Sequence, residues 1–319
     1  MAEILDLEKK YPLVFQTAKY LKTQSSLFEN TIGKQMKQNF NFELAERIFE
    51  NGLRMANNSW DTYCSNLNNL IDMSIKFLRL QKNLEKTGKY LYSTFEEVEK
   101  NEYNINNKDS SGPDYLWGLY FSEIFWKIHH NFFNFSLNDF MSGLPATGKV
   151  LEVPSGTGLF LCEFLINNPN WLGVGIDIAD SSIKFSQKLL QINNIPNNSY
   201  KILKMNFHQL EPNEKYDRIL CGEFLEHLED PLAALKRLKS LLKDDGKLFI
   251  TVAVWAAHVD HIFLYESSDQ VREHIRKADL KIEKELVQAV FEKDEAEPEK
   301  EKIPVSYACL LYTSDAADE

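Results

Sequence analysis

The run from Glu152 to Gly158 (EVPSGTG) carries the residue types that hold a small charged ligand against a peptide backbone. Gly156 and Gly158 have no Cβ, so the chain can approach a ligand closely there. A dinucleotide fingerprint would continue with glycine or alanine at position 161, which is leucine. The carboxylate of Glu152 disfavours a pyrophosphate and suits an ammonium group. We therefore expect Glu152, Ser155, Gly156 and Gly158 to bind a cationic cofactor with an amino-acid moiety rather than a dinucleotide.

A second acidic residue, Asp177, lies 25 residues after Glu152 and ends the apolar run GVGID. A carboxylate at this point can accept hydrogen bonds from both hydroxyl groups of a ribose. Nicotinamide enzymes use the same device, so Asp177 does not distinguish the two cofactor classes. We expect Asp177 and the following Ile178 to bind the cofactor.

Two other groups of polar residues follow predicted strands. Asn206 and Phe207 could meet the edge and face of an adenine, although Asn206 could equally be an ordinary turn residue. His227 is the side chain best suited to remove a proton near neutral pH, unless it only caps the next helix and bonds Glu226. His258 and His261 are three residues apart and could face one side of a turn, but the sequence shows no third ligand for a zinc site.

These motifs resemble those of the class I S-adenosylmethionine-dependent methyltransferases. VLEVPSGTG matches their first motif, an acidic residue followed by alternating glycines, except that Pro154 replaces the first glycine. YDRILCGEFLEHLEDP resembles the fourth-strand motif of quinone-biosynthesis and related small-molecule methyltransferases. The resemblance covers about residues 114–308 and implies that Glu223 flanks the cofactor, while Glu226 and His227 are the catalytic residues at the mouth facing the acceptor.

The same resemblance bears on metal binding. Some quinone O-methyltransferases of this type bind a divalent cation through the equivalent carboxylates and histidine, and carboxylate-rich sites suit Mg²⁺. S-adenosylmethionine is the cofactor that we expect. Mg²⁺ stays open as a second cofactor but is not favoured, and no metal ligands are assigned.

The elements that position these residues follow from the spacing of apolar runs. From Lys149 onward, short apolar runs alternate with amphipathic segments, a pattern typical of a parallel α/β sheet. The predicted strands cover 149–153, 172–177, 200–206, 216–222 and 247–255, and the runs 281–291 and 303–308 suit an antiparallel closing hairpin. The resemblance implies a doubly wound, seven-stranded, mostly parallel sheet whose last strand is antiparallel.

The ends of the chain are interpreted differently. Residues 1–112 predict a helical region that covers the acceptor pocket or pairs two subunits as a homodimer, with a polar linker at 101–113 before a methyltransferase domain at 113–308. Residues 309–319 (CLLYTSDAADE) resemble the translation of a transposase adapter used in sequencing libraries. We expect this tail to be non-native and to contribute nothing to the fold; the alternative is a frayed acidic tail.

Composition limits the classes of partner. The net charge of −11 disfavours nucleic acid and anionic membranes, and no apolar run is long enough to span a membrane. Four scattered cysteines suit a reduced, cytoplasmic protein. We expect a methyltransferase acting on oxygen or nitrogen of a small-molecule acceptor. The alternatives are a nicotinamide-dependent oxidoreductase and a non-catalytic scaffold that binds S-adenosylmethionine.

Overall fold

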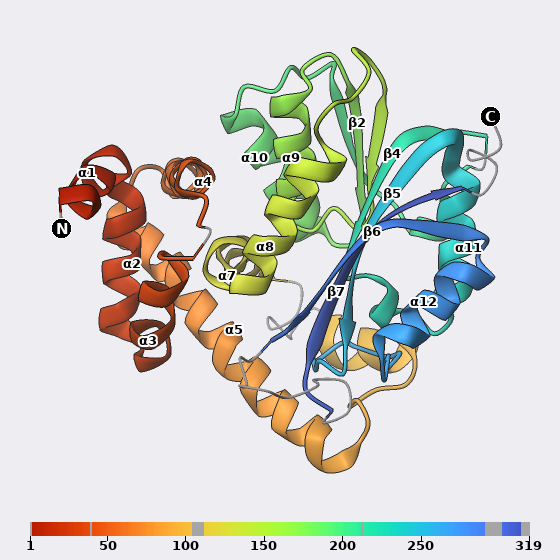
Figure 1. Ribbon diagram of the computed structural model, residues 1–319, viewed down its shortest axis with the longest axis horizontal. Coiled ribbons are helices and arrows are strands. Elements are labelled where there is room, and N and C mark those ends of the chain that lie inside the picture. Colours follow the sequence, from red (N-terminus) through yellow and green to blue (C-terminus); the bar gives the residue numbers. More distant parts are fainter. Residues whose placement is uncertain (1, 39, 104–111, 212, 291–301, 314–319) are drawn as a thin grey trace.

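The computed structural model of the protein describes residues 2–38, 40–103, 112–211, 213–290 and 302–313. Its centre is a seven-stranded sheet in the order β3-β2-β1-β4-β5-β7-β6 (Figure 1). All neighbours pair in parallel except β7, which runs antiparallel to both β5 and β6. The predicted fold class is confirmed. The strands are β1 (Lys149–Glu152), β2 (Leu172–Asp177), β3 (Tyr200–Lys204), β4 (Tyr216–Gly222), β5 (Leu242–Val254), β6 (Leu280–Ala289) and β7 (Val305–Thr313).

Helices cover both faces of the sheet because successive strand residues point to opposite sides. Leu220 and Phe249 belong to one buried cluster, together with side chains from four helices: α7 (Pro113–Phe125), α8 (Lys127–Phe135), α9 (Leu159–Asn167) and α10 (Asp180–Ile192). Their strand neighbours Ile219 and Leu248 belong to a second cluster, with side chains of α11 (Pro231–Leu241) and α12 (Ser268–Lys277). In Figure 1, α9 and α10 accordingly lie on one side of the sheet and α11 and α12 on the other.

The predicted N-terminal helical region is present, at the left and bottom of Figure 1. Its longest helix, α5, packs along α7, and a Cβ on Gly118 would lie 2.9 Å from the backbone oxygen of Asn69, so this close packing requires glycine. Buried side chains of α2, α4 and α5 belong to the same cluster as α7 to α10, so region and sheet share one core. The region comprises α1 (Ala2–Lys10), α2 (Pro12–Gln24), α3 (Ser26–Gln35), α4 (Phe42–Met55), α5 (Trp60–Thr87), α6 (Phe95–Val98) and the π-helical turn η1 (Glu99–Tyr103).

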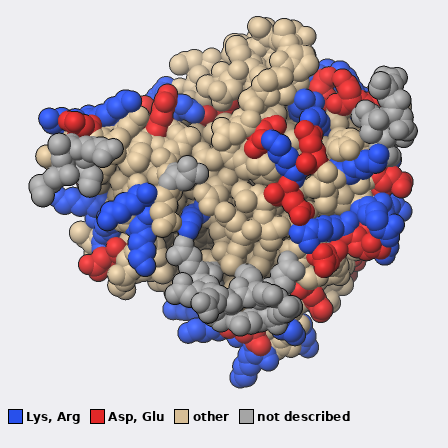
Figure 2. Space-filling model, in the orientation of Figure 1, with Lys and Arg blue, Asp and Glu red and all other residues tan. Residues whose placement is uncertain are grey.

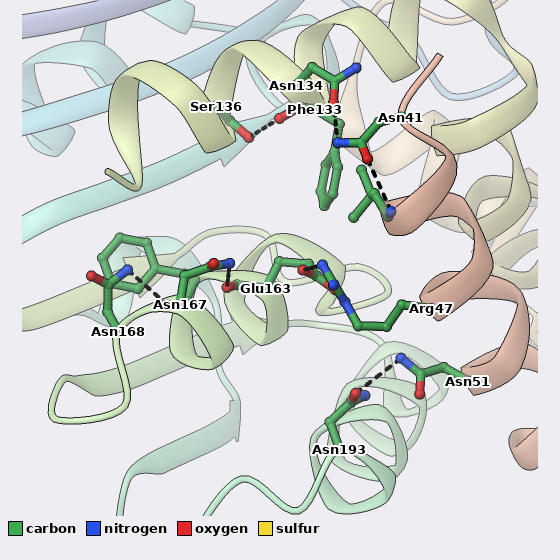
Figure 3. Close-up of polar contacts among 12 residues, drawn as sticks. Asn41, Arg47, Asn51, Phe133, Asn134, Ser136, Glu163, Asn167, Asn168 and Asn193 are labelled. Atoms are coloured by element: carbon green, nitrogen blue, oxygen red, sulfur yellow. Dashed lines mark hydrogen bonds and ion pairs between the residues drawn. The ribbon is translucent and has the colours of Figure 1, made fainter. Parts of the chain in front are cut away.

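Polar contacts join α4 to the domain that follows (Figure 3). Arg47 donates from both Nε and a terminal nitrogen to the carboxylate of Glu163 on α9, with 3.1 Å between Nε and Oε1. Asn51 donates to Asn193 at the end of α10 at 3.0 Å. The Glu163 side chain is fully buried. The predicted boundary at 112/113 therefore separates two segments of one packed unit, and most of the predicted linker, 104–111, lies outside the described residues.

The expectation that residues 309–319 contribute nothing to the fold is wrong for residues 309–313. They lie in β7, where Cys309 and Leu311 pair with Ile250 and Leu248 of β5, and Cys309, Leu310 and Leu311 are buried. The physical reason is that CLLYT is an apolar segment, and it continues a strand between two partners that satisfy its backbone. The adapter origin of the segment stays a prediction, and residues 314–319 lie outside the described part of the chain.

The charged side chains on the face drawn in Figure 2 are mixed in sign. On α12, Arg272 pairs with Glu285 of β6 at 3.0 Å, and Arg276 pairs with Glu273 at 2.8 Å. Because these charges are paired, α12 presents no electrostatic field of a single sign. A phosphate-binding surface needs such a field. Among the helices that the structure describes, none is long and apolar enough to cross a membrane.

Candidate active site

A cavity of about 1800 Å³ lies between the carboxyl ends of the parallel strands and the helices α3, α5, α7 and α8. Ligands of open α/β sheets bind at this edge. A pocket for one drug-sized ligand usually measures about 300–1,000 Å³, so the space admits a cofactor and a second molecule. Of the eleven predicted site residues, nine line it: Glu152, Ser155, Gly156, Asp177, Ile178, Asn206, Phe207, Glu223 and His227. Gly158 and Glu226 do not line the cavity.

The loop after β1 presents two buried polar side chains to this cavity. Glu152 ends β1 and is 5% exposed, and its Oε2 has no hydrogen-bond partner among the described residues. Ser155 Oγ is buried and lacks a partner in the same sense. Burial raises the pKa of Glu152 well above its ordinary value, although a hydrogen bond to the backbone of Leu161 opposes the shift. A cationic ligand group beside Glu152 would supply the missing interaction.

Gly158 shapes this loop from behind. It precedes α9 with φ +69°, and a Cβ there would lie 2.7 Å from Cβ of Ser186 on α10. The glycine therefore permits a left-handed turn and close packing between loop and helix. Its predicted role in direct cofactor contact has no support from the lining of the cavity.

Asp177, at the end of β2, orders the same loop. Its Oδ2 accepts from the backbone N of Gly156 at 3.0 Å, and its Oδ1 accepts from the backbone N of Ala179 at 2.9 Å. Hydrogen bonds from the backbone of Ile178 and from the side chain of Ser182 also reach this carboxylate. A carboxylate has about four lone-pair sites, so ribose hydroxyls would share them with these donors. Burial raises the pKa of Asp177, against these backbone hydrogen bonds. The adjoining Ile178 is exposed at the cavity and offers an apolar surface.

The side chain of Asn206 is already used by the backbone. Its Oδ1 accepts from the backbone N of His208 at 2.9 Å, and Gln209 Oε1 accepts from Asn206 N at 3.1 Å. This capping box starts the short helix η3 (Phe207–Gln209), as the turn alternative anticipated. The amide nitrogen of Asn206 and the second lone pair of its Oδ1 are left for an adenine. Phe207 is buried edge-on against Phe224, with 5.4 Å between ring centroids.

The motif after β4 folds into the short helix η4 (Leu225–His227). Glu223 adopts φ +44° and donates its backbone N–H to the backbone oxygen of Thr251 at 3.1 Å. Glu226 was predicted at the mouth of the site, but it is 0% exposed and lies outside the cavity lining. Its Oε1 accepts from Ala253 N at 3.2 Å, while Oε2 has no partner among the described residues. Burial, and next the carboxylate of Glu223, raise the pKa of Glu226 well above its ordinary value.

His227 does reach the cavity, beside two histidines from the loop after β5. Its ring centroid lies 4.8 Å from that of His261 and 6.4 Å from that of His258. His258 Nδ1 and the carboxylate of Asp260 form a short hydrogen bond. Burial lowers the pKa of His261 well below its ordinary value, and the nearby imidazoles lower it further. Burial alone would raise the pKa of the Asp260 carboxyl, but the surrounding histidines hold that pKa well below its usual range.

Glu226, His227 and His261 form a cluster that sequence reasoning missed. One ligand atom from each lies within 4.8 Å of the other two. The sequence shows no third ligand for His258 and His261, because α11 and β5 separate them along the chain from Glu226 and His227. His258, the other histidine of that pair, bonds Asp260 instead.

The end of α5 and the segment after it contact the loop after β5, which carries His258 and His261. Gln81 donates from Nε2 to the backbone oxygen of Trp255 at 3.1 Å and accepts from Ala257 N at 2.9 Å. Tyr90 donates its hydroxyl to the backbone oxygen of Ala256 at 2.8 Å. The N-terminal region therefore contacts the β5 loop next to His258 and His261.

Comparison with known proteins adds a family and a fold. The sequence model of a methyltransferase domain matches residues 126–297, more than half of the chain. The ubiquinone biosynthesis O-methyltransferase of Neisseria meningitidis serogroup C is 29% identical over 104 residues, which are 32% of this chain and 43% of that protein. The enzyme of that name from Glaesserella parasuis serovar 5 is 33% identical over 121 residues, or 36% and 49% of the two chains.

This chain thus spans less than half the length of these relatives. Among solved structures, a mitomycin 7-O-methyltransferase superposes with a TM-score of 0.52 at 14% identity. The superposition covers 75% of this chain and 68% of that one, and it shows a shared fold.

Proposed function

Because this chain belongs to the family of methyltransferase domains, we propose that it transfers the methyl group of S-adenosylmethionine to an oxygen or nitrogen atom of a small molecule held in the cavity. The observation that carries the proposal is a buried carboxylate oxygen of Glu152 that has no hydrogen-bond partner among the described residues. An amino-acid ammonium group is a cation of the right size and hydrogen-bonding capacity to meet it. In the proposed complex, Asp177 binds the ribose and Ile178 and Phe207 provide apolar contact to the adenine.

The geometry also supports an acceptor-side role for His227. Its Nδ1 lies 3.2 Å from the backbone oxygen of Asp260, and a carbonyl oxygen only accepts, so Nδ1 carries the hydrogen. The lone pair is therefore on Nε2. Because S-adenosylmethionine is already activated, the protein chiefly aligns the acceptor and excludes water. A lone pair beside the acceptor serves in deprotonation or in holding a cation. A carboxylate oxygen of Glu226 lies within 4.8 Å of a ring nitrogen of His227.

The residues at this site fit a divalent cation. Glu226 has one buried oxygen that meets no hydrogen-bond partner in the described part of the chain, and two imidazole rings lie beside it. Glu226 and His227 would hold the ion, which when bound would act as a Lewis acid toward an acceptor oxygen. Mg²⁺ remains a candidate for this ion in the proposal.

The N-terminal helical region is proposed to shape access to the acceptor, since Gln81 and Tyr90 contact the loop that carries His258 and His261. Pairing of subunits through these helices remains a second role for them, to be tested by sedimentation. We also propose a cytoplasmic location, for which the four free cysteines described are support.

Two measurements test the proposal. Calorimetry should show binding of S-adenosylmethionine and S-adenosylhomocysteine at one site per chain. Incubation with S-adenosylmethionine and a small-metabolite extract should then produce S-adenosylhomocysteine. Binding without turnover against any extract would favour the non-catalytic scaffold, and binding of NADH instead of S-adenosylmethionine would favour the oxidoreductase.

A further inference from the structure

We infer that His261, from the loop after β5, completes a cation site with Glu226 and His227, and that this site selects a transition-metal ion such as Zn²⁺ over Mg²⁺. The family resemblance connects a divalent cation with the carboxylates and histidine of the motif after β4. The inference adds His261 as a ligand and names the class of ion that binds. Cation binding is measured on the protein alone, so it stands or falls separately from methyl transfer.

The first argument is placement. Glu226 and His227 come from η4, and His261 comes from the loop after β5, yet one ligand atom of each lies within 4.8 Å of the others. Two ligands of one ion lie at most about 4 Å apart when each bond is about 2.0–2.2 Å, so small side-chain rotations reach this spacing. Backbone hydrogen bonds join the two segments. The backbone oxygen of Glu226 accepts from the backbone N of Ile262 at 2.8 Å and from that of Phe263 at 2.9 Å.

The second argument is the hydrogen position on the two rings. His261 Nδ1 lies 3.0 Å from the backbone oxygen of Ala256, and His227 Nδ1 lies 3.2 Å from the backbone oxygen of Asp260. Both oxygens only accept, so both Nδ1 atoms donate and both Nε2 atoms keep a lone pair. Histidines that ligate metals are held in this way, with the other ring nitrogen donating to a carbonyl or carboxylate.

The third argument is charge. Glu226 is 0% exposed, and its Oε2 has no hydrogen-bond partner among the described residues. Burying such a carboxylate is costly unless a cation compensates it. Two imidazoles and a buried carboxylate are therefore placed to bind a divalent ion.

The donor set decides which ion. Mg²⁺ prefers oxygen ligands in octahedral geometry, whereas imidazole nitrogen suits Zn²⁺, Co²⁺, Fe²⁺ and their neighbours. A site with two nitrogens and one oxygen therefore favours a transition metal. A lone pair that binds a cation is not free to take a proton, so the inference assigns Nε2 of His227 to the ion.

The test uses the full chain, stripped of metal with a chelator and titrated with Co²⁺, whose visible absorption reports nitrogen and oxygen coordination. We expect one Co²⁺ per chain, displacement by stoichiometric Zn²⁺, and no displacement by a large excess of Mg²⁺. His261→Ala should weaken Co²⁺ binding by at least about 100-fold, since loss of an outer-shell partner alone costs up to about that much.

Two further variants keep the result interpretable. His261→Asn retains a donor for the backbone oxygen of Ala256 but has no ring nitrogen, so it should fold and still lose Co²⁺ binding. His208→Ala removes an exposed histidine outside the cluster and should bind Co²⁺ like the wild type. Binding unchanged in both His261 variants, loss of binding only in His258→Ala, or equal affinity for Mg²⁺ would each overturn the inference. Calorimetry with S-adenosylmethionine on the same samples separates such a failure from failure of the proposed function.

Discussion

Replacing Glu152 with glutamine tests cofactor binding most directly, because the change keeps the shape of the side chain and removes its charge. The carboxylate is 5% exposed at the cavity, and its Oε2 has no partner among the described residues. A hydrogen bond to a charged group contributes about 1.5–3 kcal/mol. Losing the bond to the cofactor's ammonium group should therefore weaken S-adenosylmethionine binding by about 10- to 150-fold, at 1.4 kcal/mol per tenfold.

The same substitution should stabilise the protein without cofactor. Burial raises the pKa of Glu152 well above its ordinary value. A carboxyl with a higher pKa in the folded state destabilises the fold as pH rises above the unfolded pKa. Glu152→Gln should therefore melt at a higher temperature than the wild type at about pH 7.5, and the gain should disappear near pH 4, about the unfolded pKa.

Titration calorimetry measures the affinity, and scanning calorimetry without cofactor measures the melting temperature. Glu211→Gln, an exposed site on the loop before β4, is the matched control and should change neither quantity. An unchanged affinity for S-adenosylmethionine in Glu152→Gln would refute the ammonium site. A lower melting temperature at neutral pH would refute the argument that the buried charge opposes folding.

Four other predictions follow from particular contacts. Asp177→Ala should weaken cofactor binding more than about tenfold by calorimetry, since two charge-assisted bonds to the ribose are lost; unchanged affinity would sink the ribose assignment. His227→Ala should lower turnover by roughly 10²–10⁴-fold if the ring acts as a general base, and should remove metal-dependent turnover if it binds the ion, in either case with cofactor affinity nearly intact; a fully active variant would remove His227 from the mechanism. Arg47→Met should cost about 3 kcal/mol in urea unfolding because it strands a buried carboxylate, and the double variant Arg47→Met/Glu163→Met should recover most of it; a silent single variant would show that the pair is dispensable. Deleting residues 309–319 should lower or abolish thermal stability, because burial of each large apolar side chain contributes about 1.5–3 kcal/mol; an unchanged melting temperature would show that β7 ends at 308 in solution.

The sheet was predictable because its strands are short apolar runs bounded by polar turns. The runs at 172–177 and 216–222 coincide with β2 and β4 to the residue. The end of α11 was less predictable. The helical pattern runs to Lys243, but the helix stops at Leu241 and β5 begins at Leu242, because Leu242 pairs with Tyr216 of β4. Strand pairing over a long sequence separation therefore outweighs local helix propensity.

The placement of Glu152 and Asp177 beside the cavity was predictable for a similar reason, since each ends a strand and strand ends meet at one edge. Their contact with a cofactor stays a prediction. The cation cluster was not predictable. His261 reaches Glu226 only because the loop after β5 folds back onto η4, and no local pattern encodes that contact. The same applies to Arg47 and Glu163, whose pairing depends on how α4 docks against α9 (Figure 3).

Glu152 ends β1 and Glu226 follows the adjacent strand β4, and each has one buried oxygen without a partner among the described residues. Burial raises the pKa of both carboxyls, so each favours a nearby cation. Their positions relative to the cavity differ. Glu152 lines it and can meet an organic ammonium group, whereas Glu226 is outside the lining and has His227 and His261 beside it. A cation bound at Glu226 would have nitrogen ligands beside it. We therefore propose different partners for the two buried acids: the amino-acid end of the cofactor at Glu152 and a metal ion at Glu226.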